Sequence, residues 1–542
     1  MECTCLIYSC SSVRMPCSSS FAVVHIYTCS NLVSPCTMEQ FGMPAFSYYY
    51  AFWPLLALLV HAILRAGKKP GPSLPPGPWQ LPLIGSFHHL LRGHPHHTMR
   101  HLSLRHGPLM LLKICERVAV VASSADAARE IFHDAALEQR PSSPALDEQY
   151  SRYGMGIIFA PYGDHWRLVR RVLVAELLAA RRVDSFRRIR EDEAARLVSS
   201  LASPPRGQLV NVDERLEEFV ADSAVRAVFG DRLPDRAAFL KMLKQALDLS
   251  SVFDLRDLFP SSRLAWMLPR NRKAERNRRE AVRLMDDILR LHEERRTAGD
   301  GDRERDMIDV LLRIQKEGAM GLSLTHGVIR AVLMDVFIAA LDTTASTLQW
   351  AKAELVANPR VKEKAQLEIR RALAGQDRVH EAALVDLHYL KAVIRETLRL
   401  HPVSPLIPRV CLDDRKILGY DVPKGTIVVT NVWAISRDPK YWEDPEKFMP
   451  ERFQGEDRTV KARGLEFGFM PFGGGRRMCP GISFAQINIE IALASLLYHF
   501  DWELPNGVKP EEVDMSELFG ITVRRNAALL LRPIPHVLPV VK

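Results

Sequence analysis

The chain has 542 residues, which suits one large globular domain or two to three ordinary ones. Apolar residues make up 47% of it and charged residues 25%, so most of the chain should fold and bury a sizeable core. The formal net charge is +9, but the basic residues are mixed with acids along the chain, which excludes a nucleic-acid-binding arm. Such a charge favours a basic docking face for an acidic partner, or attraction to an anionic membrane surface.

The cysteines are concentrated at the N-terminus, where six of the nine lie within the first 36 residues. A secreted fold built on disulfides would spread them through the chain, so the body is predicted to be cytosolic and reduced. We interpret residues 1–45 as an N-terminal extension. Within it, residues 1–37, which precede Met38, are interpreted as disordered or as an artefact of the translation start. A small Cys-rich metal site is the alternative, but the cysteines lack a convincing ligand spacing.

Residues 46–64 (FSYYYAFWPLLALLVHAIL) predict a transmembrane anchor. The stretch contains no Asp, Glu, Lys or Arg and is just long enough to cross a bilayer core. Basic residues follow it directly, which places the rest of the chain in the cytosol. Pro54 and His61 weaken the span, so a buried or interfacial helix is the alternative. Residues 65–82 are rich in proline and predict a stiff, extended linker between the anchor and the body.

Helical periodicity dominates the body, residues 83–542, which we expect to form one domain. Apolar residues recur at three-to-four spacing over 160–203, 211–230, 272–298, 325–358, 359–376 and 480–500. Short runs rich in β-branched residues predict strands at 108–114, 117–123 and 426–434. The fold class predicted from these patterns is mainly α with smaller β-sheets (α+β).

A glycine-rich stretch, MPFGGGRRMCPG, precedes the helical pattern at 480–500 and contains Cys479. Glycine lets a backbone approach a flat ligand closely, and Pro480 suits a first helical turn. Cys479 is therefore predicted at a helix N-terminus, where the dipole and free N–H groups favour thiolate over thiol. A lone cysteine is more often a small buried apolar residue, and only its neighbours reverse that interpretation here.

The stretch resembles the haem loop of the cytochrome P-450 family, F-x-x-G-x-R-x-C-x-G, at Phe472, Gly475, Arg477, Cys479 and Gly481. The resemblance implies the cytochrome P-450 fold with a single N-terminal transmembrane helix. It also implies that haem b is bound at this loop, with the sulfur of Cys479 as axial ligand of the iron. Arg477 would then pair with a haem propionate.

Residues 325–358 predict one long helix that is apolar almost all round, with Asp342, Thr343 and Thr344 in its centre. A threonine hydroxyl can bond the carbonyl four residues back, here Ala339, and locally loosen the helix. The stretch resembles the family's [AG]-G-x-[DE]-T-[TS] signature, except that Ala340 replaces the usual glycine. By that resemblance Thr343 hydrogen-bonds bound O2 and Asp342 relays protons to it. Polar residues at a helix kink are the alternative.

Two further sets of residues resemble family motifs. Glu396 and Arg399, with Arg452 of the P-E-R-F element, would form a buried ion network that supports the haem loop. Haem propionates would be held by the residues of a W-x-x-x-R motif and by the arginine of a later strand. These residues are Trp166, Arg170 and Arg409.

Substrate contacts of the family map to about 141–157, 336–343, 403–407 and 518–523. They predict an apolar pocket for a lipophilic substrate lined by Val403, Leu406, Ile407, Phe337, Phe519 and Ile521. For each of these residues plain core packing is the alternative. A histidine cluster at 88–97 lacks a suitably spaced acidic partner, so we interpret it as solvated surface.

The narrower resemblance is to plant microsomal (A-type) haem-thiolate monooxygenases of specialised metabolism, carried by FAPYGDHWR, DLFPSSRL, RDPKYWEDPEKFMPERF and ELFGITVRR. It implies oxidation of a lipophilic small molecule, with a terpenoid as the leading guess, at the endoplasmic reticulum membrane. O2 would be the co-substrate, and electrons would come from NADPH through a separate membrane-bound reductase. The alternatives are a haem-thiolate isomerase or dehydratase acting on a peroxide without O2, and a non-catalytic haem protein. Product formation that depends on NADPH and reductase separates all three.

Overall fold

In a computed structural model the chain divides into two compact units, Met1–Gly71 and Pro72–Lys542. The structure describes residues 73–537 except 92, 143–153, 206, 231–232, 234, 251–253, 269–271, 298–304, 319–323 and 455–466. The predicted extension, the predicted anchor at 46–64 and the start of the linker therefore lie outside the described residues. Among the described helices, none combines the length and the hydropathy needed to cross a membrane.

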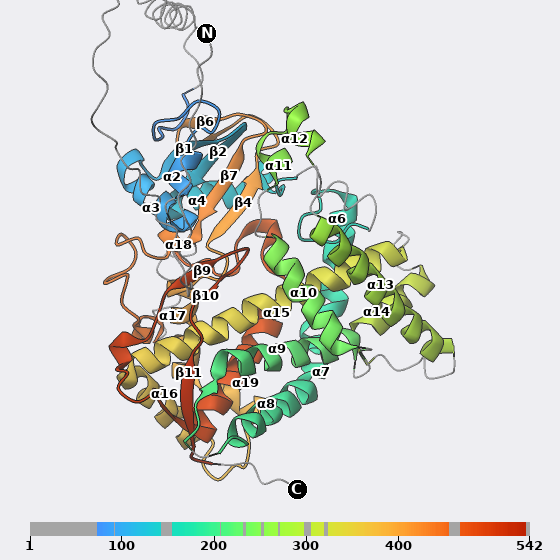
Figure 1. Cartoon of the computed structure of the whole chain (residues 1–542), viewed down its shortest axis with the longest axis vertical. Helices are drawn as coiled ribbons and strands as arrows, with labels where there is room; N and C mark the ends of the chain where they lie inside the picture. The colour runs from blue at the N-terminus through green and yellow to red at the C-terminus, as the bar shows by residue number, and fades with distance from the viewer. Residues whose placement is uncertain are drawn as a thin grey trace, which may run out of the picture. The chain divides into compact units, whose positions relative to one another are not determined.

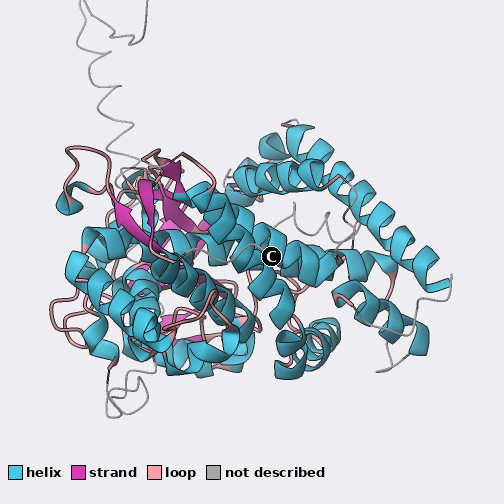
Figure 2. Ribbon diagram, turned by 90° about the horizontal axis from the view of Figure 1, so that it is seen from below, coloured by secondary structure: helices cyan, strands magenta, loops and turns pink. Residues whose placement is uncertain are grey.

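Helices make up most of the second unit, as Figures 1 and 2 show, and the prediction of a mainly α fold with smaller sheets is confirmed. The longer helices are α3 (Pro95–His106), α8 (Arg187–Ala202), α9 (Val212–Phe229), α10 (Arg236–Ser250), α13 (Arg272–Arg295), α15 (His326–Ala357), α16 (Pro359–Ala372), α17 (His388–Leu400) and α19 (Ile482–His499). The shorter ones are α2 (Phe87–Leu90), α4 (Ala125–His133), α6 (Asp164–Val172), α7 (Ala180–Ser185), α11 (Leu255–Leu258), α12 (Arg263–Met267), α14 (Met307–Glu317) and α18 (Val432–Ile435).

The largest described sheet joins segments that lie far apart in the sequence (Figure 1). Its strands follow the order β1 (Leu109–Ile114), β2 (Arg117–Ala122), β7 (Ile427–Asn431) and β4 (Leu406–Val410). The β2–β7 pair is parallel, and the other two pairs are antiparallel. Smaller sheets are formed by β3 (Val210–Asn211) with β11 (Leu530–Pro535) and β8 (Phe500–Glu503), by β9 (Glu517–Phe519) with β10 (Val523–Arg525), and by β5 (Arg415–Ile417) with β6 (Tyr420–Val422).

Helix α15 runs through the helical part of this unit (Figure 1) and packs against α9, α17 and α19. The Thr325 hydroxyl accepts a hydrogen bond from the Val328 N–H, which caps the start of the helix. Its C-terminal half is almost entirely buried, as expected for a helix that is apolar on every side. This central position lets α15 carry side chains into the interior of the protein.

Two of the predicted elements are interrupted in the structure. The pattern at 160–203 is three helices, because a π-turn at Leu173–Leu177 follows α6 and short turns separate α7 from α8. The predicted strand at 426–434 ends at Asn431, whose side chain accepts from the Ala434 N–H and starts α18. In both cases a local hydrogen bond or turn interrupts an otherwise continuous apolar pattern.

Candidate active site

The loop that carries Cys479 is shaped by its backbone. The Cys479 N–H donates to the Phe472 carbonyl at 3.0 Å, and the Met478 N–H donates to the Gly475 carbonyl at 3.1 Å. Gly475 has a φ of +66°, and a Cβ there would lie 2.6 Å from the carbonyl oxygen of Phe132. A side chain at this position would therefore clash with α4, which explains the glycine. The following helix starts at Ile482, so Cys479 precedes it by a short turn, and the predicted first helical turn at Pro480 is wrong.

Burial dominates the electrostatics of the Cys479 sulfur. It raises the pKa of the thiol, and the Gly481 N–H and the positive charge of Arg170 counteract it only in part. The hydrogen-bond donor and the positive charge therefore favour the thiolate, as predicted. They do not outweigh the effect of burial, so the protein alone does not fully stabilise the thiolate. A metal cation bound to the sulfur would supply the missing compensation.

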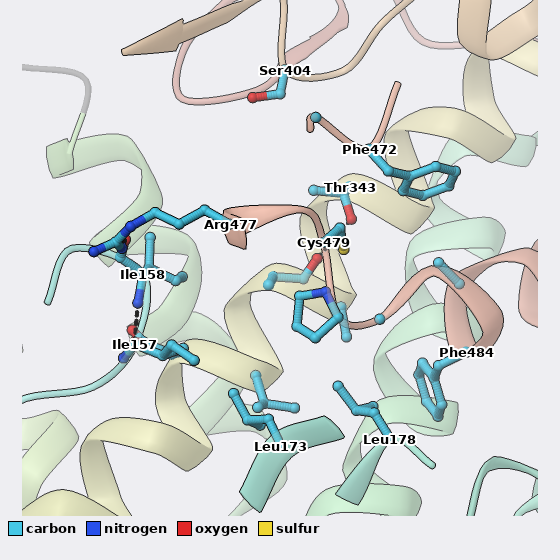
Figure 3. A pocket seen from close by; sticks show the side chains of 18 of the residues that line it. Ile157, Ile158, Leu173, Leu178, Thr343, Ser404, Phe472, Arg477, Cys479 and Phe484 are labelled. Carbon is cyan, nitrogen blue, oxygen red and sulfur yellow. Dashed lines mark hydrogen bonds between the residues drawn. The ribbon is translucent and has the colours of Figure 1, made fainter. Parts of the chain in front are cut away.

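Cys479 opens into a mainly apolar pocket with about 1570 Å³ of space not filled by protein atoms, including solvent at its opening (Figure 3). Thr343 of α15 and Phe472 line the same pocket. The apolar lining comes from several elements and includes Ile157, Ile158, Leu173, Leu178, Val228, Val336, Val403, Ile407, Phe484 and Ile489. A pocket of this size and character suits a large planar cofactor together with a lipophilic ligand.

Helix α15 presents threonine hydroxyls at the pocket. The Thr343 hydroxyl donates to the Ala339 carbonyl at 2.7 Å, which confirms the predicted bond to the residue four positions back. Thr347 repeats the pattern and donates to the Thr343 carbonyl at 2.8 Å. Both threonines line the pocket together with Ala339 and Ala340. One face of the helix therefore brings rotatable hydroxyl groups next to the Cys479 loop.

The structure does not place Asp342 among the residues that line this pocket. Its buried carboxylate accepts a hydrogen bond from the Thr522 hydroxyl and pairs with Arg524 at 2.6 Å. Both partners belong to the C-terminal hairpin of β9 and β10 or to its turn. Asp342 thus joins α15 to that hairpin, and its predicted role in proton relay stays a prediction.

An excess of positive charge gathers at one end of the pocket. Burial and the nearby charges of Arg140 and Arg477 lower the pKa of Arg409 to about 9, and the negative charge of Glu138 offsets only a smaller part of this effect. The Nη1 atom of Arg409 and the Nε atom of Arg140 are buried without a hydrogen-bond partner among the described residues. Buried cations of like charge are unstable unless an anion joins them. Two carboxylates, such as the propionates of a haem whose iron is bound to Cys479, meet this requirement.

The other predicted cofactor residues lie around the same positive end. The guanidinium of Arg477 lies 4.8 Å from the ring centre of the buried Trp166, and it donates to the Ala160 carbonyl at 2.6 Å. Arg170 also lines the pocket, and its charge acts on Cys479. Arg140 was missed by the sequence analysis, because it matches no motif and lies just before a variable stretch.

The structure also brings together the predicted scaffold residues. Arg399 makes two bonds of 2.8 Å to the carboxylate of Glu396, and both side chains are fully buried. Arg452 reaches the same carboxylate at 3.2 Å. Arg399 also donates to the carbonyls of Ser436, Pro445 and Lys447. This network binds α17 to the segment that precedes the Cys479 loop.

Only part of the predicted substrate pocket lines the cavity. Val403 and Ile407 do so, but Leu406, Phe337, Phe519 and Ile521 do not, because Phe337 packs in the core and Ile521 is exposed.

The interpretation of the histidine cluster as solvated surface is wrong for His96, which is fully buried. Its Nε2 atom lies 2.8 Å from Glu517, and His97 lies 2.9 Å from the same oxygen. The acidic partner comes from a distant segment that sequence spacing does not bring near.

Comparisons with known proteins agree with this geometry. The family model described as Cytochrome P-450 matches residues 75–531. Desmethyl-deoxy-podophyllotoxin synthase of Sinopodophyllum hexandrum is 42% identical over 487 residues, which cover 88% of this chain and 95% of the relative. The 5-epiaristolochene 1,3-dihydroxylase of Nicotiana tabacum is 41% identical over 503 residues, covering 91% and 99%. A zebra fish cytochrome P-450 structure with abiraterone matches at a TM-score of 0.69 and 27% identity, covering 82% of this chain and 99% of that one.

Proposed function

The chain belongs to the cytochrome P-450 family and is a haem-dependent monooxygenase of specialised metabolism, and from this premise we propose that it inserts one oxygen atom of O2 into a terpenoid. The observation that carries the proposal is that Cys479 and Thr343 open onto one apolar pocket. Several relatives with terpenoid names, such as premnaspirodiene oxygenase of Hyoscyamus muticus at 40% identity over 502 residues, support the substrate class.

Haem bound at this site supplies the activation of O2 and the oxygen transfer. The residues of the chain would hold and orient it: the sulfur of Cys479 would bind the iron, and Arg140 and Arg409 would neutralise the propionates. Thr343 holds a proton on its hydroxyl at the pocket wall, and rotation about its side chain can redirect that proton from the Ala339 carbonyl into the pocket. The apolar lining excludes water from the substrate.

Electrons for the reaction come, we propose, from NADPH through a separate reductase. The sequence contains no recognisable flavin or NADPH motif that would let the chain supply them itself. The net charge of +9 favours docking of an acidic partner surface.

We further propose that residues 46–64 anchor the protein in the endoplasmic reticulum membrane with the catalytic domain in the cytosol. Exposed apolar side chains of the described unit support a membrane-facing surface. They gather in α12, where Leu264 and Met267 are 73% and 80% exposed, and in residues 79–83, where Leu83 is 85% exposed. Both segments adjoin the turn between β1 and β2. The Cys115 N–H donates to the carbonyl of Ile84, which follows residues 79–83, and the Glu116 carboxylate accepts from the N–H of Ser261, which lies just before α12.

The proposal is tested with microsomes that contain the chain and a plant NADPH-dependent reductase. A panel of sesquiterpenes, diterpenes and lignans is screened for substrate-induced haem spectral shifts, and hits are incubated with isotopically labelled dioxygen. We expect a terpenoid product that carries one labelled oxygen atom and requires NADPH. Turnover of lignans alone would contradict the substrate class. A product formed without NADPH would contradict the proposed electron source.

A further inference from the structure

Two histidines in the first turn of α3 converge on an acidic side chain from near the end of the chain. The Nε2 atoms of His96 and His97 lie 2.8 and 2.9 Å from the same carboxylate oxygen of Glu517, which belongs to β9. One ligand atom from each of the three residues lies within 4.8 Å of the other two. Two imidazole nitrogens and one carboxylate oxygen match the donor set of zinc sites that have three protein ligands.

Hydrogen bonding within the protein does not explain why both rings approach this oxygen. His96 is fully buried and bonds the Glu517 carboxylate through its Nε2 atom. The Nε2 atom of His97 is buried next to the same oxygen, yet it has no hydrogen-bond partner among the described residues. Without a shared proton, the lone pairs of this nitrogen and this oxygen repel each other. A cation bound by both atoms relieves that repulsion.

Aromatic neighbours hold the two imidazole rings in position. The His97 ring stacks on Trp433 with 4.1 Å between the ring centres, and the His96 ring stacks on Phe519 with 5.5 Å between them. The side chain of Asn431 donates to the His96 carbonyl at 2.9 Å, which fixes the first turn of α3. Ligands that are packed in place before an ion arrives lose little conformational entropy when they bind it.

The nearest arginines leave the Glu517 carboxylate available to a cation. Arg100 and Arg437 both lie over the ring of Trp433 and both pair with Glu446, at 2.7 and 3.0 Å. Within the described part of the chain, the ion pairs of Glu517 are those with the two histidines. The side chain of Glu517 is only 9% exposed, so its charge lies where a bound cation is weakly screened by water.

We propose that His96, His97 and Glu517 bind a divalent transition-metal ion, with Zn²⁺ as the ion that best matches this donor set. The side chain of His97 is 41% exposed, so solvent reaches the site and water can complete the coordination. The ion would tie α3 to the hairpin of β9 and β10, which also holds Asp342 of α15. The three residues do not line the Cys479 pocket, so the metal site is separate from the haem site.

The test uses the full-length haem-containing protein and Zn²⁺ alone as the probe. Zinc per haem is counted by mass spectrometry after dialysis against a buffered zinc solution. His97→Phe removes one ligand but keeps a ring to stack on Trp433, and Glu517→Gln keeps a neutral oxygen that accepts from His96. His101→Ala is the matched control, because His101 is an exposed histidine of the same helix that does not belong to the three-residue group.

We expect the wild type and His101→Ala to bind one zinc ion per haem more than His97→Phe and Glu517→Gln. The N-terminal cysteines are present in all four proteins, so zinc bound there cancels in the difference. Calorimetric titration should show an affinity about 100-fold lower in the two ligand variants. Equal zinc content in all four proteins would overturn the proposal. Loss of the ion in His101→Ala would assign it to surface histidines of α3 and would overturn the proposed ligand set.

Hydrogen exchange tests whether the ion ties α3 to the hairpin. We expect zinc to slow exchange in the peptide that contains β9 about tenfold in the wild type and in His101→Ala, but not in the ligand variants. If Glu517→Gln yields no folded haem protein, His97→Phe decides alone, since it leaves the bond between His96 and Glu517 intact. Wild-type zinc content in His97→Phe, or exchange in β9 that zinc does not change in the wild type, would overturn the proposal.

Discussion

Two clusters of buried arginine in this protein differ in how completely their charge is satisfied. Around Glu396 the guanidinium groups of Arg399 and Arg452 meet a shared carboxylate and several backbone carbonyls. At the pocket, Arg409 and Arg140 each bury a nitrogen atom that has no hydrogen-bond partner among the described residues. In the first cluster the protein itself supplies these partners, and the cluster stabilises the fold. In the second cluster Glu138 is the one carboxylate among the described residues that offsets the charge of Arg409, so the negative charge of a bound ligand would stabilise the cluster further.

Disrupting the cluster around Glu396 should have the largest effect on stability. Glu396→Ala leaves Arg399 and Arg452 without their shared carboxylate, so we expect the free energy of unfolding to fall by about 3–5 kcal/mol. Thermal unfolding and the yield of carbon-monoxide-binding haem protein measure this. Glu503→Gln removes the exposed pair with Arg532 and should change the free energy of unfolding by about 1 kcal/mol or less. Equal effects of the two substitutions would contradict the comparison.

Arg409→Met should stabilise the haem-free protein but weaken the binding of haem. Removing a buried cation without a full set of partners stabilises the haem-free protein by about 1–3 kcal/mol. The same change removes a propionate partner, so haem should dissociate about tenfold faster. Melting curves of both forms and haem transfer to a scavenger protein measure these effects.

Arg437→Met is the control for that prediction. Arg437 is also buried, and its Nη1 atom lacks a hydrogen-bond partner among the described residues, but its other nitrogens bond the Leu400 carbonyl and Glu446. We expect it to destabilise both forms. Stabilisation of the haem-bound protein by Arg409→Met would show that Arg409 does not face the cofactor.

Lys352 extends the comparison to a buried basic residue that does not line the pocket. Its Nζ atom has no hydrogen-bond partner among the described residues. Its Nζ atom lies 3.8 Å from the ring centre of Trp502, and burial holds its pKa well below the ordinary 10.5. Lys352→Met should raise the free energy of unfolding by about 1–3 kcal/mol without changing haem affinity.

The gain from Lys352→Met should depend on pH. Between the lowered pKa of the folded state and about 10.5, the unfolded wild type binds more protons than the folded one, so wild-type stability rises with pH. The advantage of the substitution is therefore largest near neutral pH and shrinks towards pH 10.5. Melting temperatures of both proteins across this range measure it, and a constant difference would contradict a titrating Lys352.

Thr343→Ala should have the smallest effect on stability and a specific effect on function. The lost bond to the Ala339 carbonyl lies within one helix, so we expect a change of about 1 kcal/mol or less in the free energy of unfolding. NADPH consumption should persist while product yield falls, because a proton donor at the pocket is missing. Unchanged yield per NADPH in this variant would remove Thr343 from its assigned role.

The sequence by itself determined the family, the mainly helical class and the residues of the haem loop. Cys479 and its glycines act through local backbone geometry, which a contiguous motif contains, and the Thr343 bond to Ala339 likewise follows from helical spacing. The start of α19 at Ile482 was not predicted, because a proline that suits a first helical turn also suits the turn before a helix.

Only the tertiary structure decided which distant charges meet. Asp342 pairs with Arg524, and His96 with Glu517, across long stretches of sequence. Asp335 likewise accepts a hydrogen bond from the Ile157 N–H, 178 residues before it. Electrostatic partners are chosen by proximity after folding, and periodicity carries no information about which segments become neighbours. The same reason explains why Arg140 and Lys352 were not singled out before their burial was known.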